Sequence, residues 1–123
     1  MQLEHWHWIC TAKLINPPAN IRDINARIKK LVRAIDMKIL DGPHTVYCDT
    51  VGNKGYTSVA VIETSHIAMH IWNEQSPAMV QLDVYSCQKF SKQQVLEWLA
   101  EFNPIQIEMF YLDRKDTIKP SVF

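Results

Sequence analysis

The sequence predicts an α+β domain, a two-layer sandwich in which an antiparallel sheet carries two helices on one face. Two amphipathic helical segments flank a series of strand-like runs, and the connections between these runs are as short as hairpin loops. Two helices are too few to cover both faces of a sheet, so we expect both to pack on the same face. With 123 residues, the chain can form one sizeable core, and residues 1–123 are expected to form a single domain.

The first strand and the first helix have clear local signals. Residues 4–12 alternate with a period of two, which predicts a strand, and Asn16-Pro17-Pro18 ends it. Asn20 is a suitable N-cap for the helix that follows. The apolar stripe of this helix consists of Ile21, Ile24, Ile28, Leu31, Val32 and Ile35. Asp41-Gly42-Pro43 then predicts a turn.

The second half of the chain continues with strands and one more helix. The strand-like runs cover approximately residues 44–51, 56–63, 66–73 and 79–87. Ser91 and Gln94 form a capping box that begins the second helix. Its apolar stripe consists of Val95, Leu96, Leu99 and Phe102. Asn103-Pro104 ends this helix, residues 105–112 alternate as a last strand, and the polar tail from Asp113 is expected to be loose.

Composition and charge narrow the class of protein. Hydrophobic residues make up 47% and charged residues 21%, as in soluble globular proteins. Thirteen basic and thirteen acidic residues cancel, so we expect neither a nucleic-acid partner nor a membrane partner. No run approaches the ~20 apolar residues of a membrane span, and the N-terminus does not read as a signal peptide. Three widely spaced cysteines, Cys10, Cys48 and Cys87, predict free thiols and a cytoplasmic location.

The sheet face opposite the helices must be covered by something else. Four large aromatic residues on the predicted strands are candidates for burial against a partner subunit: Trp6, Trp8, Trp72 and Tyr85. We therefore expect a homodimer.

The stretch IETSHIAMHIWNEQ, residues 62–75, concentrates two of the five histidines in one strand. Alternation gives one face to Ile67, Met69 and Ile71, and the other to His66, Ala68, His70 and Trp72. His66 and His70 would lie ~13 Å apart on a strand, too far for two ligands of one zinc ion. We therefore expect no metal. Taken singly, Ser65 reads as a turn residue and Cys87 as a small buried apolar residue.

A resemblance assigns these residues a chemistry. Residues 59–74, VAVIETSHIAMHIWNE, followed by LDVYSC at 82–87, resemble the prokaryotic S-adenosylmethionine decarboxylase proenzyme family. That family shows an apolar strand, Glu-Ser-His, His-x-Trp-Pro-Glu, and then Asp-apolar-aromatic-Thr-Cys at similar spacing. The resemblance covers most of the chain and implies the fold of that family.

The resemblance also implies a self-processing enzyme. It implies decarboxylation of S-adenosylmethionine to the aminopropyl donor for spermidine synthesis, by a covalent pyruvoyl group derived from Ser65 and without a metal. In the family, the precursor serine attacks the preceding carbonyl, and β-elimination then cuts the chain, here between Thr64 and Ser65. The resulting ketone forms a Schiff base with the substrate amine and accepts electrons as carbon dioxide leaves.

Further roles are carried over from the family residue by residue. His70 corresponds to the base of the elimination, and Thr57 to a hydroxyl residue that assists processing. Cys87 corresponds to the acid that returns a proton to the substrate carbon. The substrate-binding positions are Glu74, which corresponds to the residue that holds the ribose hydroxyls, together with His66 and Trp72.

Several positions depart from the family pattern. Thr64 replaces the glutamate before the precursor serine, and its β-branch stiffens the site of cleavage. Asn73 replaces a proline, and Val51 lies where we would expect an aromatic residue for the adenine ring. Two alternatives therefore stay open. One is a pyruvoyl decarboxylase of arginine or ornithine, and the other is an uncleaved, non-enzymatic homologue that binds S-adenosylmethionine or a partner subunit.

Overall fold

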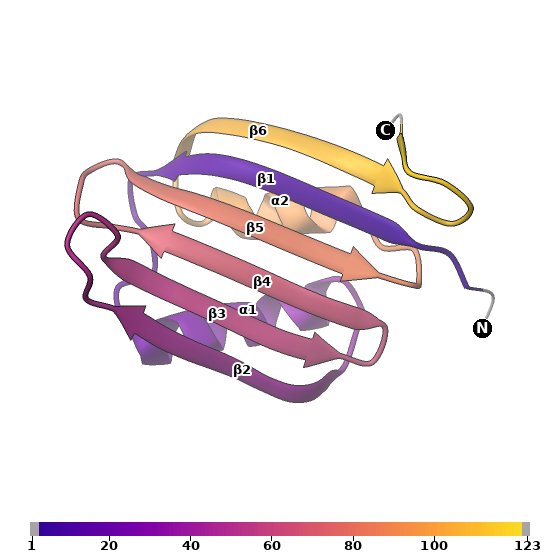
Figure 1. Cartoon of the computed structure of the whole chain (residues 1–123), viewed down its shortest axis with the longest axis horizontal. Coiled ribbons are helices and arrows are strands. Elements are labelled where there is room, and N and C mark those ends of the chain that lie inside the picture. Colours follow the sequence, from indigo (N-terminus) through magenta and orange to yellow (C-terminus); the bar gives the residue numbers. More distant parts are fainter. Residues whose placement is uncertain (1–2, 122–123) are drawn as a thin grey trace.

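The computed structural model describes residues 3–121 as an antiparallel sheet with two helices on one face, which confirms the predicted class (Figure 1). The elements in chain order are β1 (Trp6–Leu14), α1 (Ile21–Ala34), β2 (Ile39–Cys48), β3 (Gly55–Ile62), β4 (Ser65–Trp72), β5 (Ala78–Ser86), α2 (Lys92–Ala100), β6 (Pro104–Asp113) and β7 (Lys119–Pro120). Their order across the sheet is β2-β3-β4-β5-β1-β6-β7.

The sheet is built from a meander and an inserted first strand. Strands β2 to β5 follow one another as hairpins, and β1 lies between β5 and β6 (Figure 1). This topology brings the start of β1, the start of β4, and the ends of β5 and β6 to the same end of the sheet. Residues from four distant parts of the sequence therefore meet there.

The core lies between the sheet and the two helices. Asn20 caps α1 as predicted, since its Oδ1 accepts a hydrogen bond from the Asp23 backbone N–H at 2.8 Å. The buried residues of α1 are Ile24, Ile28, Leu31 and Val32, and those of α2 are Val95, Trp98 and Leu99. Trp98 was not part of the predicted stripe, and its indole N–H donates to the Arg27 carbonyl at 2.9 Å.

The prediction that Trp6 and Trp8 face a partner subunit is wrong. Trp8 is fully buried in the core, and Trp6 packs against the same core with its ring edge-on to Tyr111. The alternation of side chains along β1 separates its two faces, but it does not predict which face the helices cover. Trp72 and Tyr85 do lie on the other face, which we call the open face because no helix of the described chain covers it (Figure 1).

Two further expectations are corrected at the edges of the sheet. Residues 41–43 do not form a turn but lie within β2, where its register with β3 shifts. An edge strand tolerates such an irregularity because it has only one partner to match. The tail after Asp113 is not loose throughout, since Lys119–Pro120 forms β7 and pairs with the end of β6.

The open face combines imidazole, hydroxyl and apolar side chains. Its partly exposed apolar residues include Val46, Val59, Val61, Met79 and Phe110. Neither helix of the described residues has the length and apolar character that a membrane crossing requires.

We predict that α1 stabilises the folded protein mainly through its buried residues. Ile28→Ala should lower the free energy of unfolding by about 2–5 kcal/mol, because Ile28 is fully buried against the sheet. Ile21→Ala, a matched change on the same helix at a 41% exposed residue, should stay within about 0.5 kcal/mol. Urea unfolding at fixed protein concentration measures both. Equal losses for the two variants would contradict the assignment.

Candidate functional site

Ser65 lies at the first position of β4, directly after the two-residue turn of Glu63 and Thr64. Its φ angle is +152°, a value that residues with a Cβ rarely adopt. Such backbone strain persists only where neighbouring contacts impose it, and it is common at functional sites.

The Thr64 residue is held from both sides. Its side chain is 5% exposed, with Oγ1 3.1 Å from the Met37 sulfur and 2.9 Å from Ser86 Oγ. Its carbonyl oxygen accepts a hydrogen bond from the Cys87 backbone N–H at 2.7 Å. A fixed N–H at a carbonyl oxygen stabilises the negative charge that forms there under nucleophilic attack. The Cys87 N–H is therefore placed to donate to charge that would form on the carbonyl oxygen before Ser65.

His66 lies against the Ser65 hydroxyl, with 3.1 Å between His66 Nδ1 and Ser65 Oγ. The His66 ring makes an edge contact with the Tyr85 ring, at 5.7 Å between centroids. The sequence assigned His66 to substrate binding. In the structure, its imidazole is the ring that hydrogen-bonds Ser65.

His7, Tyr85 and Arg114 form a cluster beside His66 that the sequence did not single out as a site. The Arg114 guanidinium lies 4.5 Å from the centre of the Tyr85 ring and donates to His7 Nδ1 at 3.3 Å. Burial lowers the pKa of His7; Arg114 and His66 lower it further, and Asp83 acts in the opposite direction. These contacts join residues from β1, β5 and the segment after β6, so no spacing within one stretch of sequence signals them.

The three free cysteines have different surroundings. Cys87 directly follows β5 at the Ser65 end of the sheet and is partly exposed. Cys10 is buried in the core, which raises the pKa of its thiol to about 12. Cys48 is partly exposed, and hydrogen bonds with Thr50 lower its pKa. Of the three, Cys87 is the thiol placed near Ser65.

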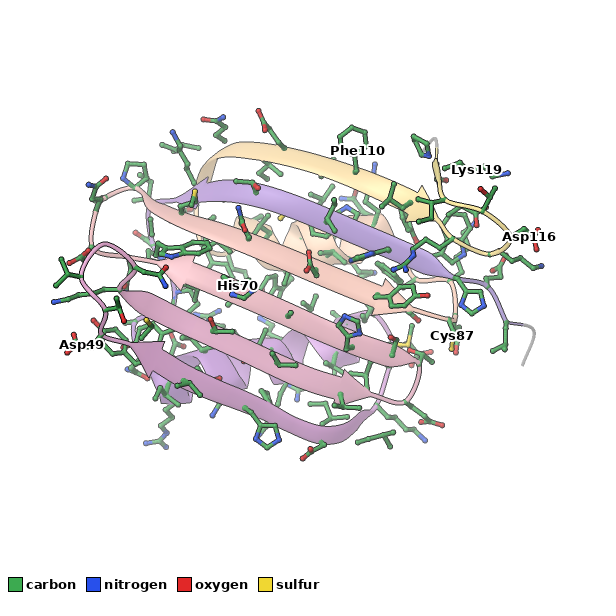
Figure 2. All side chains as sticks on the ribbon, in the orientation of Figure 1. Asp49, His70, Cys87, Phe110, Asp116 and Lys119 are labelled. Atoms are coloured by element: carbon green, nitrogen blue, oxygen red, sulfur yellow. The ribbon has the colours of Figure 1, made fainter. Side chains whose placement is uncertain are left out.

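Thr57 and His70 form a separate pair in the middle of the open face. They are opposite each other on β3 and β4, and 3.1 Å separates Thr57 Oγ1 from His70 Nδ1. Figure 2 shows His70 well away from Cys87, which lies near the end of the sheet. Five residues of a strand separate Ser65 from His70, or about 17 Å at about 3.3 Å per residue. One chain therefore does not bring His70 to Ser65.

Glu74 lies beyond β4, which ends at Trp72, so it is not on the strand face that carries His66 and His70. It instead lines a cavity of about 490 Å³, together with Trp72, Lys13, Lys54 and Met79 among others. The Trp72 indole N–H donates to Asn53 Oδ1 at 2.8 Å, and its ring stacks on His70. The cavity offers an aromatic wall and a carboxylate, at the end of β4 opposite to Ser65.

Within residues 3–121, no group of three or more histidine, cysteine or acidic side chains is arranged to hold a metal ion. The chemistry that the described residues themselves offer is a serine next to a polarised carbonyl, an adjoining imidazole and a nearby thiol.

Known proteins resemble this chain in both sequence and fold. The sequence profile of the S-adenosylmethionine decarboxylase family matches residues 7–115. S-adenosylmethionine decarboxylase proenzymes from the Langeland and Okra strains of Clostridium botulinum are each 29% identical over 93 residues, covering 72% of this chain and 75% of the relative. The crystal structure of the adenosylmethionine decarboxylase from Aquifex aeolicus VF5 aligns over 100% of both chains, with a TM-score of 0.74 and 20% identity.

We predict that thiol alkylation separates the cysteines of the folded protein. At pH 8, iodoacetamide should modify Cys48 and leave Cys10 intact, because a pKa of about 12 leaves Cys10 about a thousandfold less thiolate than an ordinary cysteine. Peptide mass spectrometry reads this out, with a sample in denaturant as the control in which both residues react. Equally fast labelling of Cys10 and Cys48 in the folded protein would contradict the burial of the Cys10 thiol.

Proposed function

We propose, since the chain belongs to the S-adenosylmethionine decarboxylase family, that it cleaves itself between Thr64 and Ser65 and then decarboxylates S-adenosylmethionine to the aminopropyl donor for spermidine synthesis. The observation that carries this proposal is the geometry of the Thr64–Ser65 peptide. Its carbonyl oxygen accepts from Cys87 N–H at 2.7 Å, while the hydroxyl of Ser65 is 3.1 Å from an imidazole nitrogen.

Cleavage proceeds in two stages in this proposal. Ser65 Oγ attacks the Thr64 carbonyl carbon and the peptide C–N bond breaks, which leaves an ester and a free amine. A base then removes the Cα proton of Ser65, the Thr64 carboxylate leaves, and hydrolysis releases ammonia and leaves a pyruvoyl group at position 65. This group supplies a ketone that binds the substrate amine and accepts electrons as carbon dioxide leaves.

The described residues fit such a group. Ser65 pairs with Ile62 on one side and Ser86 on the other, so the ladder would hold the new N-terminus in place after the cut. Cys87 follows Ser86 directly, which supports its role as the acid that returns a proton to the substrate carbon.

A second copy of the chain would supply His70. The open face carries exposed apolar residues, and two such faces can stack about 10 Å apart. A two-fold axis between the stacked sheets, crossing β4 midway between Ile67 and Ala68, sets His70 of each copy opposite Ser65 of the other. The small side chain of Ala68 favours close approach there. We therefore propose a homodimer whose two sites each combine residues of both copies.

The same two-fold arrangement brings the Glu74 cavity of one copy toward the Ser65 turn of the other. A carboxylate suits the ribose hydroxyls of S-adenosylmethionine, and Trp72 offers an aromatic wall. Glu74 makes no ion pair within the described chain, so it is free to pair with the cationic side chain of arginine or ornithine, which Lys13 and Lys54 of the same cavity would oppose. That amino-acid decarboxylase is the second candidate function. The free cysteines support a location in the reducing cytoplasm.

We predict that the purified protein splits into fragments of 64 and 59 residues and then releases carbon dioxide from carboxyl-labelled S-adenosylmethionine. Ser65→Ala should stay one chain and release none, because it lacks the attacking hydroxyl. Intact-mass spectrometry follows the cut, and trapping of labelled carbon dioxide follows turnover.

Arginine and ornithine serve as the comparison substrates in that assay. Release of carbon dioxide from arginine or ornithine, and not from S-adenosylmethionine, would identify that amino acid as the substrate. A chain that stays whole on long incubation but gains thermal stability with S-adenosylmethionine would instead identify the uncleaved binding homologue. The network that fixes Thr64 against Met37 and Ser86 is the feature that favours this last outcome.

We predict complementation between two defective chains. Ser65→Ala keeps His70, and His70→Ala keeps Ser65, so a mixed dimer should contain one complete site and cut its His70→Ala chain. Mixing the two unfolded variants and refolding them together should therefore yield fragments that neither gives alone. Mass spectrometry of the mixture measures this, with each variant refolded alone as the control. No fragments from a mixture that forms dimers would refute a shared site.

A further inference from the structure

We propose that His66 is the base that takes the hydroxyl proton of Ser65 when the chain cuts itself. This inference rests on the proposed function and adds a residue to its first stage. The resemblance assigns a base only to the elimination, as His70, and places His66 among the substrate-binding residues.

The contact between the two side chains is direct. His66 Nδ1 lies 3.1 Å from Ser65 Oγ, within the range over which a general base abstracts a proton. Within residues 3–121, His66 is the one side chain that hydrogen-bonds the Ser65 hydroxyl. His70 of the same chain is about 17 Å away along the strand.

The His66 ring is held in position by its neighbours. His66 is paired with Val61 of β3 and Tyr85 of β5, and the Tyr85 ring contacts it at an interplanar angle of 73°. The Arg114 guanidinium also lies over the Tyr85 ring, 4.5 Å from its centre, and restricts the movement of that ring. This packing restrains the His66 ring, and no carboxylate of residues 3–121 makes an ion pair with it.

The step balances without an outside reactant. The Ser65 Oγ–H proton moves to His66 Nδ1 as Oγ bonds to the Thr64 carbonyl carbon. Charge develops on the Thr64 oxygen, where the Cys87 N–H donates at 2.7 Å. The C–N bond then breaks, and the Ser65 nitrogen takes the proton from His66 as it leaves. Amide and hydroxyl become ester and amine, and His66 ends the step with the same protons that it had at the start.

His66 and His70 then handle different protons. His66 acts on the hydroxyl proton in ester formation, and His70 of the second copy acts on the Cα proton in the elimination. Loss of either histidine therefore leaves a different species, and hydroxylamine distinguishes these because it cleaves esters far faster than amides.

The test compares cleavage of the full-length wild type, His66→Ala, His66→Gln and His70→Ala by intact-mass spectrometry, with and without hydroxylamine. Both His66 variants should slow cleavage by about 100-fold or more and yield little hydroxylamine-sensitive chain. His70→Ala should accumulate an ester that hydroxylamine cuts. Added imidazole should restore cleavage of His66→Ala, which a purely structural role would not allow. His44→Ala, at an exposed edge of the sheet, is the matched control.

Each outcome separates this role from the proposed function. If the wild type is cut and both His66 variants are cut at rates within about threefold of it, the role of His66 is refuted and the proposed function stands. A wild type that stays whole, with no hydroxylamine-sensitive ester, would overturn the proposed function and this role together. His66→Gln keeps the size and polarity of the side chain, so its thermal unfolding checks that slow cleavage is not a loss of fold.

Discussion

The register of β4 between β3 and β5 determines where the side chains of the candidate site lie. It sets Ser65 opposite Ser86 and thereby brings the backbone of Cys87 to the Thr64 carbonyl. The same register sets His70 opposite Thr57 in the middle of the open face. Because side chains alternate, a slip of one residue would turn both histidines of the strand into the core. The burial of Ile67, Met69 and Ile71 therefore positions His66 and His70 on the opposite side.

The sequence predicted most of the fold because its signals are local. Alternation found the strands from β1 to β6, and Asn20 marked the start of α1. The errors concern relations between elements. Both faces of the first strand carry apolar and polar residues. Only the positions of α1 and α2 determine that Trp8 is buried in the core. Pairing of the tail with β6 is likewise a tertiary contact that polar composition does not predict.

The sequence predicted which residues belong to the candidate site, but it did not predict how they lie relative to one another. The motif around Ser65 and Cys87 identified positions, and the structure brings these two ends together. The same structure keeps His70 and Glu74 away from Ser65, because strand length separates them. The His66 contact and the Arg114 cluster depend on packing across strands, so no period in the sequence indicates them.

The burial of Thr64 has a consequence for the direction of the proposed cut. In the proposed cut, β-elimination would turn this residue into a chain end with a carboxylate, in a place where it is 5% exposed. A charge there loses its hydration, and the Cys87 N–H compensates only in part. Under the proposed function, the new end would therefore be better hydrated outside this place, away from position 65. The burial that fixes Thr64 in the uncleaved chain would therefore favour its departure once the proposed cut is made.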